Sequence, residues 1–170
     1  MVINMKIFLI GMPGCGKTTL GRIAADRLGL KFVDMDSEIE KAEGRPISEI
    51  FSRDGEEYFR NIETEMLKNE FVCDGDKIIS TGGGIIVREE NIELLQNSGE
   101  EVVFIDRPPE KIAEDIECSQ RPLMKNGRDT IFRLYNERYR RYKRACSTEI
   151  LNNSDLKSAV LALIRVVRSR

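Results

Sequence analysis

The stretch GMPGCGKTT, residues 11–19, decides how the rest of this 170-residue sequence is interpreted. It fits the pattern G-x-x-x-x-G-K-[ST] at each fixed position, and it lies between a run of β-forming residues and a run with helical periodicity. Gly14 and Gly16 allow the backbone to turn its N–H groups inward, and the N-terminus of the following helix adds partial positive charge. A chance glycine-rich turn is the weaker alternative in this context. The stretch therefore predicts a phosphate-binding loop.

Two side chains of the loop have a defined chemistry. Lys17 can reach the β- and γ-phosphates of a nucleotide, and the Thr18 hydroxyl can ligate Mg²⁺. Cys15 occupies a variable position of the motif, so no role is assigned to its side chain. These features predict that the loop binds a nucleoside triphosphate together with a magnesium ion.

Strand and helix signals alternate along the whole chain. Apolar β-forming runs predict strands at KIFLIG, KFVDMD, KIIS, EVVFID and TEIL. The helix after the loop is expected to end at Gly29, and the last helix is expected to begin near Ser154 as its N-cap. This alternation predicts an α/β protein, a parallel sheet with helices on both faces, in a single domain over residues 1–170.

Composition narrows the class of protein. The net charge of −2 gives no overall attraction to nucleic acid or to anionic membranes, and no apolar run is long enough to cross a bilayer. No signal peptide is expected, because the N-terminus becomes strand-like too soon. The four cysteines are far apart, which predicts free thiols in a reducing cytoplasm. The absence of histidine excludes histidine-based catalysis and most zinc enzymes.

A phosphate loop alone does not separate switches, motors and kinases. A GTPase should show an N-K-x-D motif, which the chain lacks, and a motor normally needs a longer chain. The length suits a small-molecule kinase, which needs an acceptor pocket and a lid that excludes water. Two segments look inserted and are candidates for these parts: a charged helical stretch at about 36–71 and a Pro- and Gly-containing stretch at about 117–128.

The DMD sequence closes the second predicted strand. Asp34 and Asp36 are two residues apart, so they should share one face of an extended strand, at the edge of the sheet where ligands bind. One carboxylate could position Mg²⁺ through water while the other holds an acceptor hydroxyl and takes its proton. The alternative is that Asp36 only caps the next helix and Asp34 is solvated.

Three further groups are candidate ligand contacts. Arg60 and Glu63 share a helix face, either as an arginine aimed at a ligand carboxylate and oriented by the glutamate, or as a surface ion pair. The three glycines at 82–84 predict a turn whose backbone approaches a ligand closely. Arg121 could swing onto the transferring phosphoryl group, or be a solvated loop arginine.

The stretch FRLYNERYRRYKRAC, residues 132–146, is strongly basic. Most of its cations are interpreted as one solvated helix face, and one or two of them could face a ligand. A nucleic-acid patch with interleaved tyrosines is the alternative, but the net charge argues against it.

In combination, these pieces resemble the shikimate kinase family over nearly the whole chain. The matching segments are GMPGCGKTTLGR, FVDMD, GRPISEIF, DGEEYFRNIE, STGGG, RPLM and the late pair Arg138 and Tyr142. Many enzymes share the phosphate loop, but D-x-D, F-R-x-x-E, the triple glycine and R-P-L together are more specific. The resemblance implies a three-layer nucleoside-monophosphate-kinase-like fold with a five-stranded parallel sheet in the order 2-3-1-4-5. It also implies transfer of the ATP γ-phosphate to the 3-hydroxyl of shikimate, on the route to chorismate and aromatic amino acids.

The resemblance also implies roles for individual residues. Lys17, Asp36 and Arg121 would be catalytic, with Arg121 as the lid arginine and Asp36 holding the shikimate hydroxyls. ATP would be bound by the loop and the lid, through Gly14, Cys15, Gly16, Lys17, Thr18, Thr19 and Arg121. Thr18 would ligate Mg²⁺, with Asp34 acting through water. The acceptor would be bound by Asp36, Arg60, Gly82, Gly83, Gly84 and Arg138, with the two arginines on its carboxylate.

Family members usually carry basic residues shortly before R-P-L that help to cover the adenine, whereas this chain has the acidic stretch AEDIECSQ. The expected partners are ATP and shikimate, in a cytoplasmic monomer that binds neither nucleic acid nor membrane. Two alternatives stay open: a kinase of the same fold for another acceptor, such as gluconate or a nucleoside monophosphate, and a non-catalytic nucleotide-binding module.

Overall fold

Five strands form one parallel sheet in the computed structural model, which describes residues 5–118, 127–153 and 155–170. The strands are β1 (Lys6–Ile10), β2 (Lys31–Asp34), β3 (Lys77–Ser80), β4 (Glu101–Asp106) and β5 (Thr148–Leu151). Their order is β2-β3-β1-β4-β5 and every pairing is parallel, so the predicted fold class and strand order are confirmed. Each residue of β1, β3 and β4 is buried, because helices cover both faces of the central strands.

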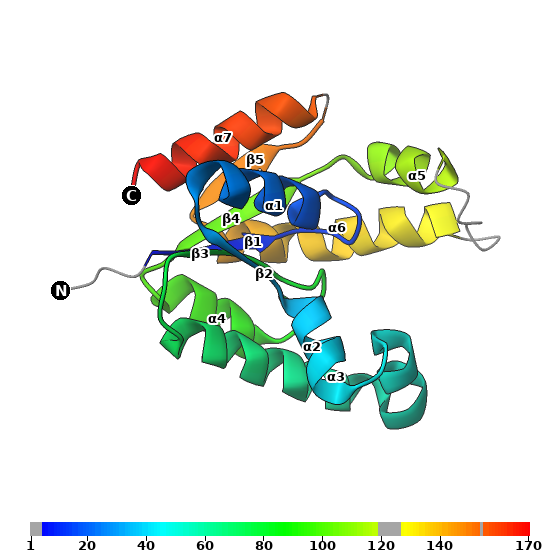
Figure 1. Ribbon diagram of the computed structural model, residues 1–170. Coiled ribbons are helices and arrows are strands. Elements are labelled where there is room, and N and C mark those ends of the chain that lie inside the picture. Colours follow the sequence, from blue (N-terminus) through cyan, green and yellow to red (C-terminus); the bar gives the residue numbers. More distant parts are fainter. Residues whose placement is uncertain (1–4, 119–126, 154) are drawn as a thin grey trace.

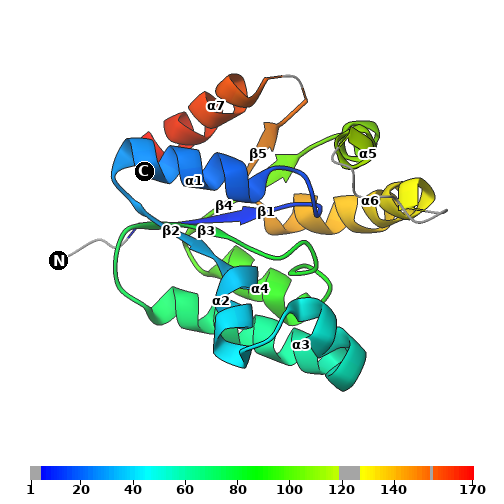
Figure 2. The same ribbon diagram turned by 45° about the vertical axis from the view of Figure 1, so that its right-hand side comes forward.

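Seven helices accompany the sheet within the described residues. Helices α1 (Lys17–Leu28) and α7 (Leu156–Arg168) pack together on one face, while α3 (Ile47–Val72) and α4 (Glu89–Asn97) lie on the other (Figures 1 and 2). Helix α6 (Gly127–Ala145) packs on α4 and on α5 (Pro109–Cys118). Helix α2 (Met35–Glu43) follows β2 directly and packs on α3. No helix among the described residues is long and apolar enough to span a membrane.

The predicted helix ends are partly confirmed. Gly29 ends α1 in the left-handed conformation (φ 68°), as the sequence predicted. The cap expected at Ser154 falls on a residue outside those described. The N-cap of α7 is the next residue, Asp155, because its carboxylate accepts the N–H groups of Lys157 and Ser158 at 3.1 and 3.2 Å.

The DMD sequence does not continue the strand, and this corrects the predicted placement of its two aspartates. β2 ends at Asp34, whose Oδ1 accepts the Ser37 N–H at 3.2 Å and so caps α2. Asp36 therefore lies in the first turn of that helix and does not share a strand face with Asp34. The alternative, in which Asp36 is the cap, is also wrong, because Asp34 has that role.

The charged stretch at 36–71 is helical, as expected, and consists of α2 and α3. Helix α3 is interrupted at Gly55, whose backbone (φ 85°, ψ 171°) is not helical, so the chain changes direction there. Of the lid predicted at 117–128, residues 119–126 lie outside the described part of the chain, and Arg121 is among them.

A buried ion pair lies at the amino end of the sheet. Lys77 at the start of β3 is 3% exposed and donates to Glu70 of α3 at 2.8 Å. Each charge is compensated by the other, which is what allows both groups to be buried. This end of the sheet is opposite to the phosphate loop, which follows the carboxyl end of β1.

Candidate active site

The phosphate loop leaves β1 at Gly11 and enters α1 at Lys17. Gly11, Gly14 and Gly16 have φ values of 149°, 78° and 100°, which only glycine adopts without strain. This backbone surrounds a cavity of about 250 Å³ lined by Gly14, Gly16, Lys17, Thr18 and Thr19. Five of the six predicted loop residues thus line one cavity at the N-terminus of α1, where an anion is favoured, while the sixth, Cys15, is buried and does not line it.

The ammonium group of Lys17 is held inside the loop. Its Nζ is buried and donates to the carbonyl oxygens of Gly11 and Met12 at 2.8 and 2.9 Å. These two acceptors satisfy the buried cation, and they hold it beside the cavity that the loop encloses. The position fits an ammonium that exchanges carbonyl contacts for phosphate contacts.

Oxygen groups suited to a magnesium ion gather next to the loop. The Thr18 hydroxyl donates to Asp34 Oδ2 at 2.8 Å and lies 3.4 Å from the Ser80 hydroxyl. Mg²⁺ prefers hard oxygen ligands and is usually held by one or two protein groups together with water and phosphate. Across the described ranges there is no group of three or more His, Cys, Asp or Glu that could enclose a metal by itself. The residues present therefore fit a magnesium ion shared with a nucleotide.

The turn 82–84 uses glycine for space rather than for backbone conformation, since none of its three residues has a positive φ. A Cβ on Gly82 would lie 2.8 Å from Asp36 Oδ1 and 2.9 Å from Glu63 Oε1. A Cβ on Gly83 would lie 2.5 Å from Cδ of Pro13 in the phosphate loop, and one on Gly84 would overlap the Arg60 guanidinium. Groups from three separate elements, namely α2, α3 and the phosphate loop, therefore pack closely against this turn.

Arg60 and Glu63 are not a surface pair. Their exposed fractions are 7% and 1%, and Arg60 NH1 donates to Glu63 Oε2 at 2.7 Å. Arg60 also donates to the exposed Glu56 at 3.1 Å. Glu63 Oε1 has no hydrogen-bond partner among the described residues. Burial raises the pKa of Glu63, although the charge on Arg60 acts in the opposite direction. The alternative of a surface ion pair is therefore wrong, and Glu63 holds the Arg60 guanidinium in one orientation.

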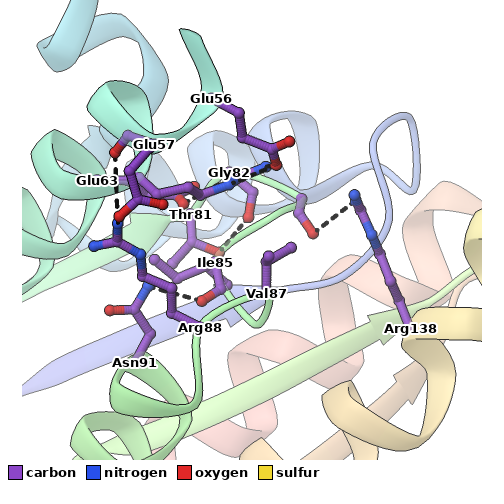
Figure 3. Close-up of polar contacts among 12 residues, drawn as sticks. Glu56, Glu57, Glu63, Thr81, Gly82, Ile85, Val87, Arg88, Asn91 and Arg138 are labelled. Carbon is purple, nitrogen blue, oxygen red and sulfur yellow. Dashed lines mark hydrogen bonds and ion pairs between the residues drawn. The ribbon is translucent and has the colours of Figure 1, made fainter.

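Arg138 reaches the turn from α6. Its NH1 donates to the Gly83 carbonyl at 3.3 Å, and the Tyr142 hydroxyl donates to the same oxygen at 2.5 Å. Figure 3 shows Glu63 to the left of Gly82, Glu56 above it and Arg138 to its right. We call Asp36, Arg60, the turn 82–84 and Arg138 the acceptor side of the site.

Asp36 is a partly buried member of the acceptor side, and it interacts electrostatically with Lys17 of the phosphate loop and with Arg60. Burial raises its pKa, and the negative charge of Asp34 raises it further, while Lys17 and Arg60 lower it. A carboxylate with a raised pKa accepts a proton more readily, which suits a group that takes a proton from a hydroxyl.

Most cations of the basic stretch in α6 fasten that helix to its neighbours or pair along it. Arg141 donates to the carbonyl oxygens of Ile86 and Val87, and Arg144 forms an ion pair with Glu89 of α4. The interpretation of these side chains as one solvated face is therefore only partly correct, because Arg138 and Arg141 reach the backbone after β3.

Two residues at the site were missed by the sequence reasoning. Asn152, which is buried, donates through Nδ2 to the Cys15 carbonyl at 2.9 Å, and a Cβ on Gly16 would lie 2.7 Å from that nitrogen. Arg107 lines a cavity of about 360 Å³ beside the loop. Both residues directly follow predicted strands, at the sheet edge where ligands bind, and that position is the signal that could have found them.

Two larger cavities, of about 460 and 450 Å³, lie elsewhere. One is lined by Phe71 and Leu94, and the other by Met5 and Arg170, among others. The second surrounds the starts of β1 and β4. Neither cavity is lined by a residue of the phosphate loop or of the acceptor side. The volume of a cavity therefore does not identify the active site in this protein.

Comparisons with known proteins agree with this geometry. A family model described as shikimate kinase matches residues 13–168. A shikimate kinase of Clostridium botulinum (strain Eklund 17B / Type B) is 50% identical over 162 residues, which cover 95% of this chain and 96% of that protein. The structure of shikimate kinase from Acinetobacter baumannii in complex with shikimate superposes with a TM-score of 0.87 at 30% identity, covering 98% of this chain and 94% of that one. The shikimate kinase of Bacteroides thetaiotaomicron gives a TM-score of 0.84 at 29% identity, covering 96% of this chain and 98% of that one.

Proposed function

The chain belongs to the shikimate kinase family, and on that premise we propose how its own residues divide the reaction. It is an ATP-dependent small-molecule kinase that transfers the γ-phosphate of ATP to the 3-hydroxyl of shikimate, giving shikimate 3-phosphate and ADP. The reaction belongs to the biosynthesis of chorismate and aromatic amino acids. Membership thus decides in favour of shikimate among the acceptors that the sequence left open.

One observation carries the assignment of the acceptor side: two arginines from different helices, α3 and α6, contact the turn 82–84, with Asp36 beside it. We assign the acceptor carboxylate to Arg60 and Arg138, because guanidinium groups match the geometry of a carboxylate. The glycine turn contributes backbone contacts at a distance that a side chain would not permit. Glu63 keeps the Arg60 guanidinium in place from inside the protein.

On the nucleotide side, the amides of residues 14–19 would hold the phosphates and Lys17 would contact the transferring group. Thr18, with Asp34 through water, would hold Mg²⁺, which when bound neutralises charge on the phosphates. Asp36 would accept the proton of the attacking hydroxyl, as its raised pKa supports. Arg121, which lies outside the described residues, is proposed as the lid arginine that stabilises the transferred phosphoryl group.

We further propose one kinase domain over residues 1–170, with an acceptor-binding insertion at about 36–71 and a lid at about 117–128. A monomer in the cytoplasm is the proposed state of the protein. Cys15, Cys73 and Cys146 are free thiols, which supports a reducing compartment.

ADP release coupled to a spectrophotometric reporter tests the function directly. Turnover should require shikimate, ATP and Mg²⁺ together. It should stop on chelation by EDTA and return when Mg²⁺ is added in excess. Gluconate and nucleoside monophosphates serve as control acceptors and should give no turnover. Absence of shikimate-dependent ADP release would refute the function, and retention of full activity in EDTA would refute the proposed metal.

A further inference from the structure

The cavity of about 360 Å³ beside the phosphate loop continues the smaller cavity inside it. Both are lined by Gly14, Gly16 and Thr19, and the larger one adds Arg107, Asp115, Asn152 and Leu156. A nucleoside triphosphate whose phosphates lie in the loop must direct its ribose and base to one side. In Figures 1 and 2 the start of α1 lies between α5 and the pair α2–α3. The acceptor side lies in the direction of α2 and α3. The base is therefore expected in the cavity at α5.

Arg107 is unusually fixed for an arginine in an open cavity. Its Nε and NH2 donate to Asp115 Oδ2 at 2.9 and 2.7 Å, and its NH1 donates to the Asn152 carbonyl at 2.7 Å. All three nitrogens are thus used along the edges of the planar guanidinium. These bonds lie in the plane of the group and do not occupy its faces. The side chain is 17% exposed, so the face that lines the cavity is the one available for stacking.

We propose that Arg107 is a nucleobase-binding residue whose guanidinium face forms one wall of the site for the ATP base. A nucleic-acid base stacks favourably on an arginine plane, and a cation over an aromatic ring adds electrostatic attraction. Asp115 is a positioning residue, because it fixes the plane of Arg107 without contacting the base. This assigns a function to one acidic residue of the stretch AEDIECSQ. Asp115 forms an ion pair with Arg107, which directly follows β4.

The inference rests on the proposed function only in taking ATP as the ligand, and binding measurements separate the two. The experiment compares the affinity for ATP with that for inorganic tripolyphosphate, which carries the phosphates without a base, by titration calorimetry. In Arg107→Ala the dissociation constant for ATP should rise about tenfold relative to that for tripolyphosphate. Arg107→Lys keeps the charge but loses the plane, and should lie between the wild type and Arg107→Ala.

Two further variants complete the test. Asp115→Asn should lower the preference for ATP over tripolyphosphate severalfold, because Arg107 loses its anchor. If Asp115 acted only through its negative charge, both ligands would bind more tightly by the same factor and the positioning role would be wrong. Lys111→Ala is the matched control: it removes a cation that pairs with Glu114 on the same helix but does not line the cavity, so the ratio should not change.

An equal loss of affinity for both ligands in Arg107→Ala, or no loss, would overturn the proposal, provided that its melting temperature matches the wild type. If Arg107→Ala melts early, Arg107→Lys decides by the same ratio. A wild-type protein that binds ATP more tightly than tripolyphosphate but does not phosphorylate shikimate would refute the proposed function and leave this inference standing.

Discussion

The phosphate loop and the acceptor side both depend on glycine, but for different physical reasons. In the loop, Gly11, Gly14 and Gly16 have positive φ values that other residues adopt only with strain. On the acceptor side, the glycines at 82–84 have ordinary backbone angles and are needed because neighbouring groups fill the space of a side chain. The loop is built by one continuous stretch, whereas the acceptor side is assembled from α2, α3, the turn and α6.

This difference predicts how each part should fail. Substitutions in the loop act on the backbone that holds phosphate, so they should weaken ATP binding and lower kcat. Changes on the acceptor side act on packing between elements, so they should affect shikimate and leave ATP binding in place. A variant in either part should change the dissociation constant for only one of the two substrates, ATP or shikimate. A variant that changed both constants equally would contradict the comparison.

The largest effect is expected for Lys17→Ala. This ammonium is the cation that the loop holds beside the phosphate cavity, and loss of a charged contact to a transferring phosphoryl group costs about 10³-fold or more in kcat. Coupled ADP release measures kcat, and calorimetry measures shikimate binding, which should change less than about twofold. Lys41→Ala, which removes an exposed lysine paired with Glu38, is the control and should keep full activity. A large loss of shikimate affinity in Lys17→Ala would contradict the division between the two parts.

Arg60→Lys should raise the shikimate dissociation constant about 10- to 100-fold, because a bidentate contact to a carboxylate is lost while the charge beside Glu63 is kept. ATP affinity should stay within a factor of about two. Arg60→Ala should have the larger effect on KM for shikimate, but it also leaves Glu63 buried without its cation. Arg53→Ala on the same helix, whose arginine is exposed and paired with Glu49, is the control. Equal weakening of ATP and shikimate would show that Arg60 has been assigned to the wrong ligand.

Gly84→Ala should weaken shikimate binding about tenfold with ATP binding unchanged, because the new methyl group would displace the Arg60 guanidinium. Calorimetry with each ligand measures this, and the melting temperature shows whether the fold is kept. If shikimate affinity were unchanged in a folded variant, the contact between Gly84 and Arg60 would have no functional role.

The pH dependence of kcat/KM for shikimate tests Asp36. Burial, and then the charge of Asp34, raise the pKa of Asp36, so its base form is lost at a higher pH than for an exposed aspartate. Activity should fall as the pH falls through that raised pKa. Asp34→Asn removes one cause of the shift and should move the acid limb to lower pH, whatever its effect on the maximal rate. Glu38→Gln removes an exposed charge from α2 and should leave the limb in place. An unmoved limb in Asp34→Asn would mean that another group titrates.

The smallest effect on catalysis is expected for the buried pair at the amino end of the sheet. Glu70→Gln leaves Lys77 buried without its counter-ion and should lower the free energy of unfolding by about 3–5 kcal/mol, with both ligand affinities unchanged. Chemical denaturation measures the loss. Replacing both residues by methionine should recover most of the stability, because the uncompensated charge is gone. A change in either ligand affinity would show that stability and binding are not separable here.

Most of the fold could be predicted from the sequence because its signals are local. The apolar runs gave the positions of all five strands, and the motif at 11–19 located the loop. The errors lie at boundaries: Asp34 ends its strand because its carboxylate caps α2, and Asp155 caps α7. At both helix starts, two nearby short polar side chains could act as the N-cap, and their spacing in the sequence does not show which one does.

Sequence patterns made Asp36, Arg60 and the triple glycine candidates, but only the resemblance to a family joined them with Arg138 into one site. From spacing alone, Arg60 and Glu63 were equally consistent with a surface pair, because burial depends on what packs over them. The triple glycine suggested close approach but not that Asp36, Pro13 and Arg60 fill the space. Asn152 and Arg107 were missed because their partners, Cys15 and Asp115, are contacts that no local pattern encodes.

Gly83 gives the two parts of the site a shared element. Its Cα packs toward the Pro13 ring of the phosphate loop, while its carbonyl accepts from Arg138 and Tyr142. A shift of the loop on nucleotide binding would move this peptide and the arginine that rests on it. We therefore expect modest thermodynamic linkage between the substrates. Since linkage is reciprocal, the factor by which ATP changes the affinity for shikimate must equal the factor by which shikimate changes the affinity for ATP.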